Sequence, residues 1–135
     1  MDYAWVAIGS AIGGMGRYWV ATAMARLTGP QFPWGTILIN IVGSFVIGLV
    51  AAATAPGGRF AAPQELRLFV MVGVCGGFTT FSSFSLQTLE LLRDGRPGEA
   101  LGNIVLSVGL CVAGVAVGYY GGTALHAARA LGQQG

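Results

Sequence analysis

The chain has 135 residues, of which 54% are hydrophobic and only 9% are charged, and it contains no lysine. Soluble domains carry about a quarter charged residues, so this composition excludes an ordinary soluble domain and indicates a protein of the lipid bilayer. The net charge of +2 comes from scattered arginines, which excludes the concentrated basic surface of a nucleic-acid-binding protein.

Four apolar stretches are each long enough to cross a hydrocarbon core, which takes about 20 helical residues. The first begins with an acid and aromatic residues rather than with lysine or arginine, so we expect a retained helix and not a cleaved signal. Glycine and proline residues separate the stretches. The four stretches predict one all-α membrane domain over residues 1–135, with four transmembrane helices at about 3–27, 34–54, 64–92 and 98–127.

Arg17 lies well inside the first span. An arginine at the centre of a helix in lipid costs about 2.5–3.5 kcal/mol on insertion scales, so we expect it to face a water-filled vestibule or a polar partner. The simpler interpretation is a side chain that extends to the nearer interface. At the mouth of a pore, Arg17 would attract anions without choosing among them.

Asn40 lies in the middle of the second span, among isoleucine, leucine and valine residues. Its amide carries two N–H donors and one acceptor oxygen. One interpretation is a hydrogen bond that joins two helices in the membrane. The other is a donor that lines a path for an ion.

The third span contains a stretch that suits no lipid-facing helix: Gly76-Gly77-Phe78-Thr79-Thr80-Phe81-Ser82-Ser83-Phe84-Ser85. Glycines loosen a helix, and in hydrocarbon every backbone group that they free needs a partner in protein, water or an ion. Irregular backbone at this depth is tolerated where it lines a cavity or a pathway. We therefore predict that the third helix breaks near its middle, close to Gly76, and that the functional site lies there.

Two aromatic rings follow the predicted break. Phe81 and Phe84 are three positions apart and share a helix face. Ring edges carry partial positive charge and can contact an anion, although a pair at this spacing is ordinarily hydrophobic core. The surrounding hydroxyl groups, such as that of Thr80, favour contact with an anion. On the fourth span, Asn103 and Ser107 are four positions apart and share one face.

Glycine spacing predicts how the helices pack. Glycines four positions apart let two helices approach closely in lipid. The pairs are Gly9/Gly13, Gly73/Gly77, Gly114/Gly118 and Gly118/Gly122.

The arginines predict the assembly. Three fall on each side of the membrane in this topology, so the positive-inside rule favours neither orientation. They are Arg59, Arg67 and Arg129 on one side and Arg26, Arg93 and Arg96 on the other. Two copies in opposite orientations would enclose an aqueous path for which four short helices leave little room. We therefore expect an antiparallel, dual-topology homodimer.

The chain resembles the Fluc/CrcB family of fluoride channels. Residues 76–85 resemble the third-helix signature of that family. Gly35-Thr36 with Asn40-Ile41-Val42-Gly43-Ser44 resembles its second-helix motif, and Gly13-Gly14 with Arg17-Tyr18 resembles its first-helix motif. The likeness covers nearly the whole chain, including its length and its four spans.

The resemblance implies that two antiparallel copies form two separate pores and export fluoride passively, which lowers its cytoplasmic concentration. It also implies a structural Na⁺ at the dimer centre, held by the backbone carbonyls of Gly76 and Thr79. The pore residues are then expected to be Asn40, Thr80, Phe81, Phe84, Gln87 and Ser107, with Arg17 in the vestibule. Two positions depart from the family, because Gln87 replaces its usual glutamate and Asn103 stands where many relatives carry tyrosine.

Two other functions stay open. A small dimeric multidrug antiporter shares four spans and dual topology, but a proton-coupled antiporter normally needs a mid-membrane carboxylate, and the acids here lie near helix ends. A non-transporting assembly factor would leave the hydroxyl-rich break unexplained. Enzymatic activity is not expected, because no nucleophile–base pair, metal cluster or nucleotide-binding loop can be assembled from these residues.

Overall fold

The computed structural model describes the backbone of residues 1–55 and 62–132 and the side chains of residues 1–55 and 62–124. These ranges form helices and no strands, which confirms the all-α prediction for them. The elements are α1 (Asp2–Thr28), α2 (Trp34–Ala53), α3 (Gln64–Arg67), the π-helix η1 (Leu68–Cys75), α4 (Gly76–Phe78), α5 (Phe81–Arg93) and α6 (Pro97–Gly132). Two arginines of the topology argument, Arg59 and Arg129, lie outside the described side chains.

Glycine and proline set the helix ends. α1 ends at Gly29, whose φ of 79° favours a residue without a Cβ, and Pro30 follows it. α2 begins directly after Pro33. The turn before α6 contains Gly95, with a φ of 71°, and α6 starts at Pro97, where the missing N–H does not weaken the helix.

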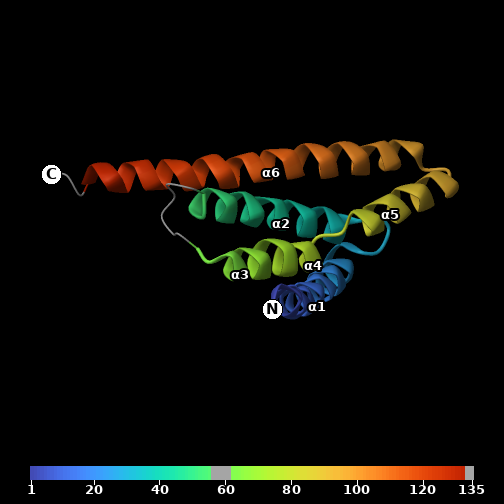
Figure 1. The fold of residues 1–135 in the computed structure, drawn as a ribbon. Helices are drawn as coiled ribbons and strands as arrows, with labels where there is room; N and C mark the ends of the chain where they lie inside the picture. Colours follow the sequence, from blue (N-terminus) through green and yellow to red (C-terminus); the bar gives the residue numbers. More distant parts are fainter. Residues whose placement is uncertain (56–61, 133–135) are drawn as a thin grey trace.

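α2 lies at the centre of the fold (Figure 1). α6 packs along one side of α2 and continues past it, while the rod formed by α3, η1 and α4 lies on another side. α1 packs mainly against η1 and α4, and Figure 1 views it nearly end-on because it crosses the other helices steeply. α5 leaves this rod at an angle and packs against the first turns of α6.

Three stretches of the described chain are long and apolar enough to cross a membrane: Trp34–Ala53, Gln64–Arg93 and Pro97–Ala124. They correspond to the second, third and fourth predicted spans. α1 is 27 residues long, but Arg17, Arg26 and several glycines lower its mean hydropathy, and it is not among the three. The first span therefore stays a prediction.

Glycines bring the helices into backbone contact. A Cβ added at Gly9 would lie 2.5 Å from the carbonyl oxygen of Phe69, and one at Gly77 would lie 2.6 Å from that of Ser10. On the other side of the fold, a Cβ at Gly118 would overlap the carbonyl oxygen of Phe45 on α2. The predicted close packing is confirmed at these contacts, which only glycine permits.

The third predicted span is broken, but the break lies after Gly76. Gly76 keeps helical angles (φ −65°, ψ −37°), whereas Thr79 and Thr80 are extended, with ψ values of 157° and 108°. The break therefore lies close to Gly76, as predicted, although the glycines themselves stay helical and Gly77 lies directly against Ser10 of α1. The extended backbone falls instead on two β-branched threonines, which suit it better than a helix. The π-helix η1 was not predicted.

Candidate functional site

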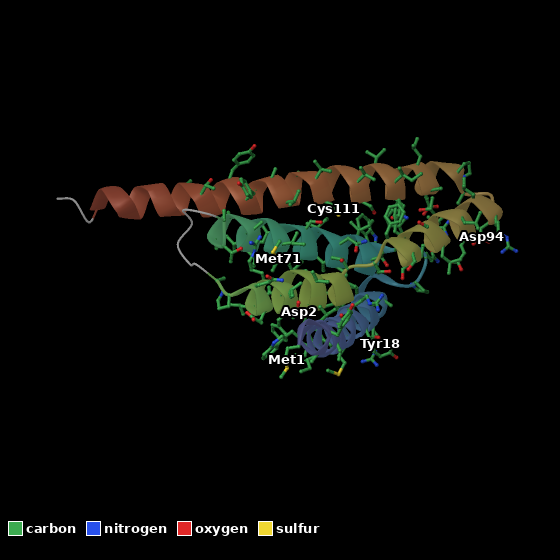
Figure 2. The ribbon with its side chains drawn as sticks, in the orientation of Figure 1. Met1, Asp2, Tyr18, Met71, Asp94 and Cys111 are labelled. Carbon is green, nitrogen blue, oxygen red and sulfur yellow. The ribbon has the colours of Figure 1, made fainter. Side chains whose placement is uncertain are left out.

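A cavity of about 460 Å³ lies beside the break, between α2, the η1–α4 segment, α5 and α6. Met71 on η1 and Cys111 on α6 belong to its walls and are labelled in Figure 2. It brings together seven of the nine predicted site residues: Asn40, Gly76, Thr79, Thr80, Phe81, Phe84 and Ser107. No aspartate, glutamate, arginine or histidine of the described chain lines it. The cavity therefore offers neutral polar groups and aromatic rings.

Asn40 bridges the break in the helix. The Thr80 N–H donates to Asn40 Oδ1 at 2.8 Å, and Asn40 Nδ2 donates to the Thr80 carbonyl at 3.2 Å. One amide thus satisfies both backbone groups of an extended residue that has left the helix. Both interpretations of Asn40 meet here, since it joins two helices and also lines the cavity.

The same hydrogen bonds free two backbone carbonyls. In a continuous helix, the Thr80 N–H would donate to Gly76 and the Ser83 N–H would donate to Thr79. Here the first goes to Asn40, and the second donates to the Thr80 hydroxyl at 3.2 Å. Gly76 and Thr79 both line the cavity, so oxygen atoms without their usual helical donors lie beside it.

Thr80 also begins α5. Its hydroxyl accepts the Ser83 N–H and donates to Ser83 Oγ at 3.0 Å, so the N-cap is satisfied locally. The two rings that follow have centroids 5.2 Å apart and planes tilted by 47°. Phe84 is 8% exposed, whereas Phe81 is 75% exposed on the open side of the cavity.

A chain of hydrogen bonds leads from the cavity along the contact of α5 and α6. Ser107 Oγ donates to Asn103 Oδ1 at 3.2 Å, and Asn103 Nδ2 donates to Thr88 Oγ1 at 2.9 Å. The Thr88 hydroxyl then donates to the Phe84 carbonyl at 2.8 Å. All three side chains are buried, and Asn103 is fully so. Sequence reasoning did not place Asn103 and Thr88 in the site, although Asn103 shares a helix face with Ser107.

Gln87 does not line the cavity. It lies in a second hollow of about 310 Å³, together with Gln31 of the α1–α2 turn and with Glu90, Asp94 and Arg96. Asp94 is labelled in Figure 2 at the end of α5, far from Met71. Gln87 Oε1 is buried there without a hydrogen-bond partner among the described residues. Two carboxylates and an unpaired acceptor give this hollow a polar, partly acidic lining.

Arg17 lies on α1, half-buried, and lines neither hollow. It makes no side-chain hydrogen bond or ion pair to another described residue, whereas Arg96 is held by Glu99 with Nε–Oε1 2.7 Å. The structure therefore does not bring Arg17 to the cavity of a single chain. Its place in a vestibule stays a prediction.

Comparison with known proteins identifies the family. The family described as "CrcB-like protein, Camphor Resistance (CrcB)" matches residues 4–119. The chain belongs to the CrcB family. The part that matches contains Arg17 and every residue that lines the cavity.

Several CrcB relatives are similar to this chain over nearly their whole length. The "Fluoride-specific ion channel FluC" of Methylocella silvestris is 54% identical over 93% of this chain and 96% of its own. Those of Rhodospirillum rubrum and Opitutus terrae are 51% and 50% identical over similar shares. These are names of ion channels and not of enzymes. Together with the three apolar stretches, membership of the CrcB family makes the chain a multi-pass membrane protein.

Proposed function

We propose that the chain is a fluoride channel that lets fluoride leave the cell down its gradient. The observation that carries the proposal is the near full-length identity to proteins named fluoride-specific ion channels. The site supports it, because the shared region contains a cavity of neutral donors and aromatic edges at a broken membrane helix. In acidic surroundings fluoride is protonated and enters the cell as neutral HF, which ionises in the cytoplasm. Fluoride then accumulates inside, so a passive channel suffices to lower its cytoplasmic concentration.

The cavity suits a small anion that must lose its water in steps. Asn40 keeps a second N–H after binding Thr80, and Ser107 lines the opposite wall with a hydroxyl that would have to turn from Asn103 to donate to an anion. The edges of Phe81 and Phe84 add partial positive charge between them. Without a carboxylate, the lining neither repels an anion nor carries the proton of an antiporter.

The functional unit is an antiparallel homodimer with two pores. In a single chain the cavity is open and the Phe81 ring is 75% exposed beside it, so a second copy is needed to enclose the path. The balanced arginines permit the two copies to insert in opposite orientations in the plasma or inner membrane. In that assembly Arg17 faces a vestibule and attracts anions to the pore.

The freed carbonyls of Gly76 and Thr79 fit a structural Na⁺. A hard cation prefers oxygen ligands, and these two oxygens lack the helical donors that would otherwise occupy them. Two copies would bring four such carbonyls together at the dimer centre. Bound there, the ion would supply positive charge next to these carbonyl oxygens.

The function is tested by anion efflux from liposomes that contain the purified protein. We expect fluoride release that starts on addition of valinomycin to a potassium gradient, with no release of chloride under the same conditions. Empty liposomes give the background. Equal release of both anions, or release of neither, would show that the chain is not a fluoride channel.

A further inference from the structure

Two buried side chains separate the cavity from the second hollow. Along α5 the cavity is lined as far as Phe84 and the second hollow begins at Gln87. Along α6 the cavity ends at Ser107, one turn after Asn103. Asn103 and Thr88 line neither hollow, are 0% and 9% exposed, and are hydrogen-bonded to each other at 2.9 Å. They form the partition between the two hollows.

The side chains of the partition are hydrogen-bonded to each other and to their neighbours on α5 and α6. The Asn103 amide accepts the Ser107 hydroxyl at one end and donates to Thr88 at the other. Thr88 in turn directs its own proton to the Phe84 carbonyl, so that its oxygen is left to accept from Asn103. An anion that arrives at Ser107 therefore meets a chain of hydrogen bonds in which Ser107 holds the Asn103 oxygen and the Thr88 oxygen already occupies one Asn103 N–H.

We propose that the Asn103–Thr88 hydrogen bond is a latch between the two hollows, and that only an anion able to displace the Thr88 oxygen from Asn103 passes. The inference rests on the proposed function, since it concerns the route by which fluoride leaves the cavity. Thr88 acts as the competitor and Asn103 as the donor that the anion takes over.

Such a latch discriminates by hydrogen-bond strength. A neutral hydrogen bond inside a protein is modest in net terms, and an ionised acceptor forms a stronger one. Fluoride is small and concentrates its charge, so it replaces a hydroxyl oxygen on an amide N–H. Chloride is larger and a weaker acceptor, so it competes poorly for the same donor.

The test removes the Thr88 hydroxyl and keeps the shape of the side chain. Thr88→Val deletes the hydroxyl, while Thr88→Ser keeps it. Thr54→Val is the matched control. Like Thr88, Thr54 donates to the carbonyl four residues back, but it takes no part in the hydrogen bonds that link Ser107, Asn103 and Thr88. Initial rates of fluoride and chloride efflux from liposomes are compared, and size-exclusion elution checks assembly.

We expect Thr88→Val to raise the fluoride rate by about two- to tenfold, the equivalent of one neutral hydrogen bond. The fluoride-to-chloride ratio should fall by a similar factor, while Thr88→Ser and Thr54→Val keep the rate and ratio of the unaltered chain. Asn103→Leu removes the donor and should slow fluoride at least tenfold. If Thr88→Val does not assemble, Thr88→Ala is measured against Thr88→Ser in the same way.

The latch is overturned if removal of the Thr88 hydroxyl leaves the rate and ratio unchanged or slows fluoride, or if Asn103→Leu conducts normally. In each of these cases the unaltered protein still releases fluoride, so the proposed function survives. If the unaltered protein releases no fluoride, the proposed function fails and the latch fails with it.

Discussion

Asn40 holds both backbone groups of Thr80, at 2.8 and 3.2 Å, and its oxygen takes the Thr80 N–H that a continuous helix would direct to Gly76. This pairing joins α2 to the start of α5, and it leaves the carbonyls of Gly76 and Thr79 beside the cavity. We therefore expect stability and fluoride release to depend on the same amide.

Replacing Asn40 with leucine should destabilise the protein and abolish fluoride efflux. Each backbone group of Thr80 that loses its partner costs about 1–3 kcal/mol when buried. Thermal unfolding in detergent measures the first effect and liposome efflux the second. Ser44→Ala, one turn further along the wall of the same cavity, is the control and should leave the unfolding midpoint nearly unchanged. An Asn40→Leu protein as stable as the control would show that Thr80 finds other partners.

Replacing Phe81 or Phe84 with isoleucine should slow fluoride efflux by at least tenfold, because isoleucine has no positive ring edge. Only Phe84→Ile should also lower the unfolding midpoint, since Phe84 is buried and Phe81 is exposed. Phe45→Ile changes a ring outside the cavity and serves as control. Unchanged flux in both variants would remove the rings from the path.

Replacing each of two adjacent glycines on α1 with alanine should have opposite effects on the stability of the protein. A Cβ at Gly13 would overlap the Val74 carbonyl and lie 2.8 Å from the Phe78 nitrogen, whereas nothing lies within 4 Å of one at Gly14. Gly13→Ala should lower stability by about 1–3 kcal/mol through overpacking. Gly14→Ala should raise it by up to about 1 kcal/mol through helix propensity. Equal unfolding midpoints would contradict the close approach of α1 to η1 and α4.

Sodium should stabilise the assembled protein. A ligand that binds only the folded state adds about 2.7 kcal/mol at a hundredfold excess over its Kd. The unfolding midpoint should thus rise with sodium chloride and stay constant with N-methylglucamine chloride at equal ionic strength. Identical curves in both salts would rule out a sodium site at Gly76 and Thr79.

Reporters fused to the C-terminus should appear on both sides of the membrane in comparable amounts, because the arginines give no bias. Removing two arginines from one side, with Arg26→Gln and Arg93→Gln, should shift the population towards one orientation. Reporters of the unaltered chain that all lie on one side would defeat the antiparallel dimer.

Local signals in the sequence located the helices well. The end of α1 follows from Gly29 and Pro30, and the beginning of α2 follows from Pro33. Each of these residues acts on the backbone of its own turn. The break near Gly76 was also predicted, but not that Thr79 and Thr80 are the extended residues, because Gly77 is engaged by α1, a contact between segments far apart in the chain. The same limit applies to the site.

Asn40 was singled out by its polarity alone, and the structure adds which backbone groups it satisfies. Thr88 was not included in the predicted site, because a threonine that donates to its own helix is unremarkable until another helix supplies Asn103. Pairings between helices were thus the part that the sequence could not reveal. Arg17 shows the converse, since its charge draws attention but it makes no side-chain hydrogen bond or ion pair with another described residue.

The break at Thr79 and Thr80 has an electrical consequence. The rod that ends at Phe78 presents the negative end of its helix dipole to the cavity, and α5, which begins at Phe81, presents its positive end. Two opposite partial charges therefore meet across two residues. These partial charges would favour a cation on the Gly76 side and an anion on the Phe81 side, so a single interruption of one helix could serve ions of both signs without any charged side chain.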